Sequence, residues 1–518
     1  MKISSRSLLS NKSNLSMETL IALYAIFFLI LTIRHLDWAI MFIIVALPSY
    51  LIRSNIFGLP ITLLELMILL TFFVWVITNW SRINANLRES LKKKNPPLLE
   101  GQIKNGQKIK IRYPFDWEII LLLLFAFTAV GTAGFSPNAL GVWKAYFFEP
   151  ILFFILVLNI FKNNANDTTI KADVNLEKIL WPLAVSTFIV SILAIYQKFT
   201  GAFIFNEFWA TVTTRRVVSF FGYPNAVGLY LGPIVLIMIG WLCCIVKNFQ
   251  FLILKSIFNF KIFKIFFISL TIAMSILSIY FAKSEGAILG IAVGLVIFGL
   301  LAGKKARLAT FLLVIIFSSS IYVYLPAKNY LIDKITLNDL SGQIRQQQWH
   351  ETWQMLKDGR TISGAGLANY QKAIQPYHQA GIFFNKDNDS DFHRKTVFNV
   401  AYRKTHWQPT EIYLYPHNIL LNFWSELGLA GLLLFAWIIG KYFFISITNY
   451  KLQITNYKYL NLGLISAMIV VVVHGLVDVP YFKNDLAIIF WLLVAMMSLI
   501  NLKCKNQNAC RVRHRQAF

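Results

Sequence analysis

Long uncharged apolar runs recur along the whole chain and limit what it can fold into. Apolar residues make up 57% of the 518 residues, whereas charged residues make up only 14%. Most runs approach the length of roughly 20 residues that a helix needs to cross the apolar core of a bilayer. Lipid rather than water must therefore solvate most of the chain, and we predict an all-α, polytopic membrane helical bundle.

The apolar runs give about 12–13 candidate spans, because the first two runs are short. The candidates are residues 18–34, 36–52, 58–80, 117–134, 141–161, 179–198, 226–246, 265–282, 287–302, 308–325, 418–440, 461–477 and 485–501. The basic residues before the first run resemble those of a signal peptide. No small-residue cleavage site follows them, so we expect a retained helix.

Lys and Arg residues, which give the chain its net charge of +25, gather between the runs. Such clusters hold loops on the cytoplasmic side, so topology explains most of the charge and nucleic acid is not an expected partner. The segments predicted to be cytoplasmic are 81–116, 247–264, 303–307 and the tail after 501. Alternation then places 199–225, 283–286 and a long loop at about 326–416 outside, and a loop of that length is usually functional.

This pattern divides the chain into five regions. They are the N-terminal membrane helices 1–178, the central membrane helices 179–325 with an outer arginine loop, the extracytoplasmic loop 326–416 with its own helices, the C-terminal membrane helices 417–503 and a basic cytoplasmic tail 504–518.

The stretch YPHNILLNFWSELGLAGL places His417 and Asn418 at the start of a candidate span. Pro416 is favoured in a first helical turn, where the helix carries partial positive charge. An imidazole at that place is biased towards the neutral form that accepts a proton. His417 is therefore a candidate general base, and simple capping of the helix by His417 or Asn418 is the alternative.

Asn418, Asn422 and Glu426 are four residues apart and form one polar stripe on this span. A polar stripe in a membrane helix faces the bundle interior or a wet cavity, because exposure to lipid is costly. Hydrogen bonding between helices is the simpler explanation of the stripe. Gly428 and Gly431 are expected to allow close packing behind it.

Arg215 and Arg216 stand on the predicted outer side just ahead of a span, against the usual distribution of positive charge. A guanidinium group binds phosphate oxygens in pairs and stays charged when partly desolvated. These residues are candidates for binding an anion, and a solvated loop or an anchor to lipid headgroups is the alternative.

The long loop contains SGQIRQQQWHETWQML, which predicts a helix starting near Ser341. Trp349 lies on its apolar face and Arg345 lies one turn earlier. Such a helix suits the membrane surface, although packing on the bundle fits equally well. His474 and Asp478, four residues apart at the end of a later span, are candidates to line the same cavity as His417.

No metal site or cofactor site is expected from the sequence. Asp387, Asp389 and Asp391 alternate as in a calcium loop, but the glycine and the closing glutamate of such a loop are missing. Gly364 and Gly366 lack the lysine and the strand–loop–helix context of a nucleotide-binding loop.

Three stretches together resemble the O-antigen ligase and O-antigen polymerase superfamily over roughly residues 179–500. The family pattern RxxGxFxxPN matches Arg216 to Asn225 with Ser219 in place of the first glycine, and HNxxLxxxxExGxxG matches from His417 to Gly431. The loop pattern R…W followed by GxG matches Arg345, Trp349, Gly364 and Gly366, without the family's proline. SEGA at 284–287 is similar to the family's SRGA turn, with Glu285 in place of arginine.

The resemblance implies a GT-C-like, metal-independent glycosyltransferase of the bacterial cytoplasmic membrane, with its active site facing outward. Such an enzyme moves a glycan from an undecaprenyl diphosphate carrier to an acceptor hydroxyl. The diphosphate needs fixed cations, which Arg216 and Arg345 supply, and the hydroxyl needs a base, which His417 supplies. Arg215, Trp349, Asn418, Glu426, His474 and Asp478 would support these three residues.

Other functions fit the same residues. A ligase, a polymerase and a protein O-oligosaccharyltransferase differ only in their acceptor, which can be a glycan, a lipid or a protein. A transporter or flippase for lipid-linked saccharides would use the arginines as a substrate pathway. Two matching halves with broken helices, which many transporters have, are not visible in the sequence.

Overall fold

The computed structural model describes residues 6–56, 59–92, 114–161, 176–247, 260–387, 389–451 and 457–516. Among these, ten helices are long and apolar enough to cross a membrane. The chain is a polytopic helical membrane protein, as predicted. The predicted spans at 18–34, 36–52 and 117–134 form helices, but they are not among the ten. The second of them stops at Val45, shortly before Pro48, and a 3-10 turn follows.

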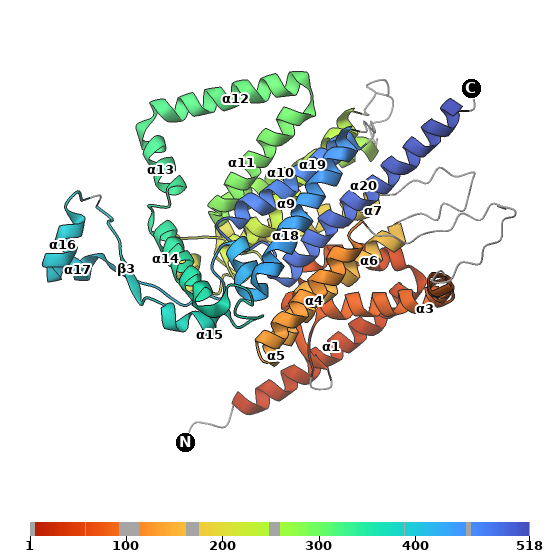
Figure 1. The fold of residues 1–518 in the computed structure, drawn as a ribbon, viewed down its shortest axis with the longest axis horizontal. Coiled ribbons are helices and arrows are strands. Elements are labelled where there is room, and N and C mark those ends of the chain that lie inside the picture. The colour runs from red at the N-terminus through yellow and green to blue at the C-terminus, as the bar shows by residue number, and fades with distance from the viewer. Residues whose placement is uncertain are drawn as a thin grey trace.

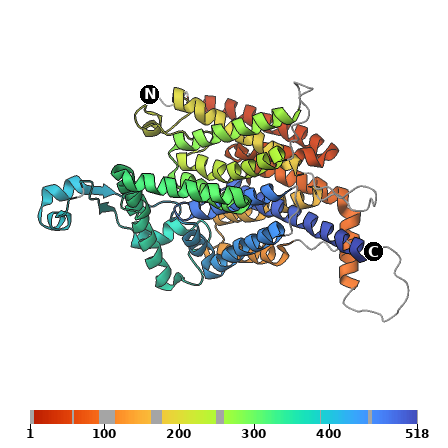
Figure 2. The same ribbon diagram turned by 90° about the horizontal axis from the view of Figure 1, so that it is seen from above.

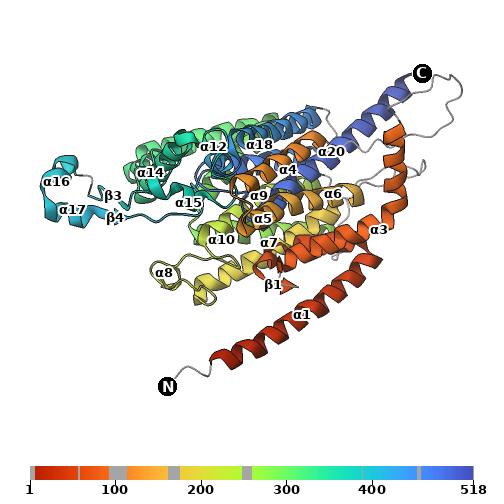
Figure 3. The ribbon, with the colours of Figure 1, turned by 60° about the horizontal axis from the view of Figure 1, so that its bottom comes forward.

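The N-terminal region lies along one side of the bundle, and α1 runs along its edge (Figure 3). Its elements are α1 (Arg6–Arg34), α2 (Leu36–Val45), a 3-10 turn (Leu47–Leu51), β1 (Arg53–Ile56), β2 (Leu59–Thr62), α3 (Leu63–Lys92), α4 (Asp116–Thr132), α5 (Pro137–Trp143), a π-helical turn (Lys144–Phe148) and α6 (Glu149–Phe161). Strands β1 and β2 form an antiparallel hairpin in which Arg53 pairs with Thr62. This hairpin was not predicted from the sequence.

The central and C-terminal helices make the bundle itself (Figures 1 and 2). They are α7 (Glu177–Thr200), α8 (Glu207–Ala210), α9 (Pro224–Lys247), α10 (Phe260–Ala282), α11 (Glu285–Ala302), α12 (Lys304–Val323), α18 (Ile419–Lys451), α19 (Lys458–Gly475) and α20 (Asn484–Gln516). The span of α20 is 94% buried, so it lies at the centre of the bundle. The span of α12 has no buried residues, and the helix lies apart from the bundle (Figure 1).

Small residues bring α9 and α19 into close contact. A Cβ atom on Gly240 would lie 2.9 Å from the Cα atom of Gly463 and 2.6 Å from the carbonyl oxygen of Tyr459. In lipid, where helix association gains little from the hydrophobic effect, such close approach is a main source of helix–helix attraction. This contact fixes the positions of the two helices whose ends carry Asn225 and His474.

The long loop folds at one end of the bundle and extends sideways from it (Figures 1 and 2). It contains α13 (Leu325–Ile335), α14 (Leu340–Met355), a π-helical turn (Leu356–Arg360), α15 (Tyr370–Ile374), a 3-10 turn (Gln375–Tyr377), β3 (Gly381–Phe383), α16 (Phe392–Phe398), α17 (Val400–His406) and β4 (Trp407–Pro409). Strands β3 and β4 form a second antiparallel hairpin. The helix predicted to start near Ser341 is α14.

Three loops that the sequence places on one side of the membrane do meet at one end of the bundle. Arg216, before α9, donates a hydrogen bond to the carbonyl oxygen of Lys283, in the turn between α10 and α11. Lys334, on α13 of the long loop, forms an ion pair of 2.7 Å with Glu285, which begins α11 directly after the same turn. The region predicted as a basic tail continues the helical backbone of α20 as far as Gln516.

Candidate active site

His417 lies in an irregular connection just before α18. Its backbone φ of 45° is in the left-handed region. The side-chain oxygen of Asn418 caps α18 by accepting hydrogen bonds from the backbone N–H groups of Leu420 at 3.0 Å and Leu421 at 3.1 Å. The prediction that Pro416 occupies the first helical turn is therefore wrong, because Asn418 provides the cap two residues later.

The imidazole of His417 is held between aromatic rings and a buried carboxylate. The ring centroids of Tyr413 and Tyr415 lie 5.1 Å and 5.0 Å from its own, both edge-on. Its Nδ1 atom lies 3.6 Å from Oδ1 of Asp478, whose side chain is 2% exposed. That distance is longer than a hydrogen bond but short enough for strong electrostatic attraction. The carboxylate is thus placed to stabilise a protonated imidazole.

Asp478 also connects His417 to Arg216. Its Oδ2 atom accepts a hydrogen bond of 3.1 Å from the amide of Asn225, and the oxygen of that amide accepts one of 3.0 Å from Arg216. Burial raises the pKa of Asp478, but the neighbouring imidazole groups of His417 and His474 lower it to about 2. The carboxylate is therefore charged at neutral pH.

Among the described residues, the hydrogen-bond partners of the Arg216 guanidinium are neutral groups. Its guanidinium donates hydrogen bonds to the backbone oxygens of Ala282 at 2.9 Å and Lys283 at 3.2 Å, besides the bond to Asn225. Burial lowers its pKa, the carboxylate of Glu285 raises it, and the charge of Arg345 lowers it further. Two like charges are thus close enough to repel each other, which favours binding of an anion between them.

Arg345 projects from α14 towards the same region. One of its terminal nitrogens donates a hydrogen bond of 2.8 Å to the hydroxyl of Ser341, whereas its Nε atom is buried and has no partner among the described residues. Trp349, one turn later, donates its indole N–H to the carbonyl oxygen of Pro416 at 2.8 Å. The helix that carries Arg345 is therefore attached to the residue that precedes His417.

Arg215 and His474 each hold two segments of the chain together beside the candidate site. Arg215 donates to the backbone oxygens of Ala210 and Lys198 at 3.0 Å, so it holds the loop to the end of α7 and does not join Arg216. His474 is 2% exposed near the end of α19. A Cβ atom on Gly286 would lie 2.6 Å from its ring, so His474 packs against the turn that binds Arg216.

Glu426 faces the interior, as the polar stripe predicts. Its carboxylate is 5% exposed and accepts a hydrogen bond of 2.7 Å from the backbone N–H of Ala368. Ala368 belongs to the loop that carries the GxG pattern, so this bond attaches the loop to α18.

Close packing of helices was expected at Gly428. The structure instead has a break in α18 there, where Gly428 has a φ of 75°. The loop crosses at this break: Ala365 donates to the carbonyl oxygen of Ser425 at 2.6 Å, and Leu429 donates to that of Ile362 at 3.1 Å. A Cβ atom on Gly364 would lie 2.7 Å from the carbonyl oxygen of Ser425. Glycine is needed in this loop because the backbones of loop and helix touch.

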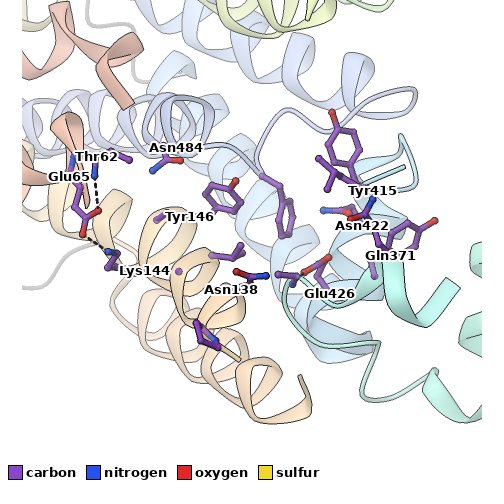
Figure 4. A pocket seen from close by; sticks show the side chains of 18 of the residues that line it. Thr62, Glu65, Asn138, Lys144, Tyr146, Gln371, Tyr415, Asn422, Glu426 and Asn484 are labelled. Atoms are coloured by element: carbon purple, nitrogen blue, oxygen red, sulfur yellow. Dashed lines mark hydrogen bonds and ion pairs between the residues drawn. The ribbon is translucent and has the colours of Figure 1, made fainter. Parts of the chain in front are cut away.

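A cavity of about 600 Å³ adjoins the candidate site. Figure 4 shows its polar side chains, among them Asn138, Lys144, Gln371, Tyr415, Asn422 and Glu426. They come from the N-terminal helices, the long loop and α18. Within the described ranges, no group of three or more His, Cys, Asp or Glu side chains is placed to hold a metal ion. Asp389 instead contacts Lys395 at 2.6 Å.

Part of the chain matches a known family. Residues 270–436 match the family described as O-antigen ligase. No curated protein matches the chain. The matched range contains Arg345, His417 and Glu426, whereas Arg216 and Asp478 lie outside it. The chain is therefore a polytopic membrane protein whose residues 270–436 form an O-antigen ligase family domain, the domain of ligase-like and polymerase-like glycan transfer.

Proposed function

We propose that this protein transfers a glycan from an undecaprenyl diphosphate-linked donor to an acceptor hydroxyl at the outer face of the cytoplasmic membrane. The observation that carries the proposal is the line of contacts from Arg216 through Asn225 and Asp478 to His417. These contacts support the proposal because they join a guanidinium group to an imidazole whose residues are far apart in the sequence.

The reaction breaks the bond between the anomeric carbon and the diphosphate oxygen while the acceptor oxygen forms a new bond to that carbon. Negative charge develops on the departing diphosphate, and Arg216 and Arg345 stabilise it. Their guanidinium groups suit phosphate oxygens because each can donate two hydrogen bonds in parallel.

The acceptor hydroxyl gives its proton to His417 as it attacks. The charged carboxylate of Asp478 stabilises the resulting imidazolium, as the carboxylate of a catalytic triad does. Asn225 bonds to both Asp478 and Arg216 and so couples the orientation of the base to that of an anion-binding group.

The test uses purified protein in sealed proteoliposomes with lipid-linked glycan extracted from the source bacterium. We expect His417→Ala to retain donor binding and to lose glycan transfer by about 100-fold or more, which is the usual contribution of a general base. A transporter would instead keep most of its flux across the bilayer. His393→Ala is the matched control, since His393 lies exposed on α16. Glycan transfer by His417→Ala at the wild-type rate would contradict the proposal.

A further inference from the structure

The cavity of about 600 Å³ beside the candidate site is separate from the groups that carry the proposed reaction. His417, Arg216 and Arg345 are not among the residues that line it. Tyr415 connects the two regions, because it lines the cavity and its ring lies 5.0 Å from that of His417. A molecule bound in the cavity would therefore lie one side chain away from the proposed base.

Two polar side chains of α18 line this cavity with incomplete hydrogen bonding. Asn422 is 1% exposed, and its Oδ1 atom is buried without a partner among the described residues. Glu426 receives a single described hydrogen bond, from Ala368, through one of its two carboxylate oxygens. Buried polar groups are normally satisfied, and each exception requires an explanation. A ligand with hydroxyl groups would supply the missing partners.

The rest of the lining suits a sugar ring. Tyr146, Tyr415 and Phe482 present aromatic surface, and Asn138 and Gln371 present amides (Figure 4). A pyranose has apolar C–H faces that pack on aromatic rings and hydroxyl groups that bond to amides and carboxylates. The volume lies within the range of small-molecule sites.

The charged side chains in the wall are Arg53, Glu65, Lys144 and Glu426, two of each sign, so the wall has no excess charge that demands a charged ligand. Lys144 forms an ion pair of 2.5 Å with Glu65, which also lines the cavity. Both residues belong to the N-terminal region, as does Asn138, and none of the three lies in the range matched by the family. The wall opposite α18 is therefore built by the part of the chain that the family match does not cover.

We propose that this cavity binds one pyranose unit of the transferred or receiving glycan, with Asn422 and Glu426 as its hydrogen-bonding groups. This inference rests on the proposed function and adds a substrate class to it. The N-terminal helices would then determine which sugar is accepted, while residues 270–436 supply the chemistry.

Binding is tested first, without any transfer reaction. Purified protein in nanodiscs is mixed with glucose, galactose, mannose, rhamnose, N-acetylglucosamine and N-acetylgalactosamine in turn, and saturation-transfer NMR reports the bound sugar. We expect at least one sugar to bind, and we expect Asn422→Ala and the isosteric Glu426→Gln each to weaken it by about tenfold. Binding that both variants leave unchanged, or binding by no sugar in the panel, overturns the proposal.

Asn449→Ala is the matched control for Asn422→Ala. Asn449 lies on the same helix and is 4% exposed, and both its amide nitrogen and its amide oxygen are buried with no partner in the part of the chain that the structure describes. It does not line the cavity. We expect this variant to bind sugar like the wild type, and equal loss of binding in both asparagine variants would show a general effect on folding and overturn the proposal.

Transfer assays then assign the source of the sugar. Asn422→Ala should raise KM for the donor if the bound unit belongs to the lipid-linked glycan, and KM for the acceptor if it belongs to the receiving molecule. His417→Ala should bind the free sugar normally. Failure of His417→Ala to reduce transfer would count against the proposed function. The sugar-binding experiment tests the proposed sugar site independently of that function.

Discussion

The imidazole of His417 and the carboxylate of Asp478 lie 3.6 Å apart because α18 and α19 form a hairpin. His417 precedes the first of these helices, and Asp478 follows the second. Asn225, at the start of α9, bonds to the same carboxylate. Three helix ends thus fix the position of one carboxylate beside the proposed base.

Replacing Asp478 with asparagine should lower kcat/KM by about 100-fold, because the imidazolium formed during transfer loses its counter-charge. The loss should be present throughout the neutral pH range, because the carboxylate that the substitution removes is charged there. The pKa of Asp478 near 2 means that its own titration lies below this range. Any stability that the charged carboxylate provides is present above its ordinary pKa and is lost as the pH falls through about 2.

The pH–rate profile of purified protein checks this prediction. Asp339→Asn serves as control, because Asp339 forms an ion pair of 2.9 Å with Lys334 elsewhere in the long loop. An Asp478→Asn profile that coincides with the wild-type profile would remove Asp478 from the mechanism.

Arg216→Lys and Arg345→Lys should each reduce kcat/KM for the lipid-linked donor by about tenfold or more. A lysine keeps the charge, but a point charge cannot reproduce two parallel hydrogen bonds to phosphate oxygens. Kinetics at varied donor concentration measure the effect. Arg394→Lys is the control, since the side chain of Arg394 is 77% exposed on α16. Full activity in both site variants would be evidence against diphosphate binding here.

Trp349→Phe should lower kcat by about fivefold, which corresponds to the loss of one hydrogen bond of about 1 kcal/mol. The change removes the indole donor that holds the carbonyl of Pro416 next to His417. Trp353→Phe is the matched control, because Trp353 is 39% exposed one turn later on the same helix. Equal effects of the two substitutions on kcat would argue against positioning by Trp349.

Gly364→Ala should destabilise the protein by about 3 kcal/mol, against about 1 kcal/mol for Gly359→Ala. Both glycines have positive φ, 68° and 77°, so both substitutions strain the backbone. Only at Gly364 would the new Cβ meet other atoms, at 2.7 Å from two carbonyl oxygens of α18, whereas nothing lies within 4 Å at Gly359. Thermal unfolding in detergent compares the two variants, and equal Tm values would show that the loop does not touch the helix as described.

Hydropathy predicts the membrane helices well because an apolar run is a property of consecutive residues and does not depend on distant contacts. Ten of the predicted spans overlap helices that are long and apolar enough to cross a membrane, among the residues described. The position of α14 was also predictable, since its start near Ser341 depends on the local sequence and needs no distant contact. The two short hairpins, β1–β2 and β3–β4, were missed because each has only three or four residues per strand.

Contacts between distant segments could not be predicted in the same way. Asn225 occurs in the family pattern, but nothing in the sequence shows that its amide bonds to Asp478, 253 residues later. Arg215 and Arg216 are adjacent and chemically identical, yet only Arg216 faces the site. Ser219 replaces the glycine of the family pattern at a φ of 51°, and its hydroxyl bonds to the carbonyl oxygen of Val190.

The interruption of α18 at Gly428 separates the first turns of this helix from the rest of the span. The crossing loop bonds to both sides of the break, because Ala365 donates to Ser425 before it and Leu429, after it, donates to Ile362. The loop therefore joins the two parts of α18 and replaces the helical hydrogen bonding that is interrupted at the glycine. Asn422 and Glu426, which lie before the break, keep their position relative to the rest of the helix only while this loop stays bound to it.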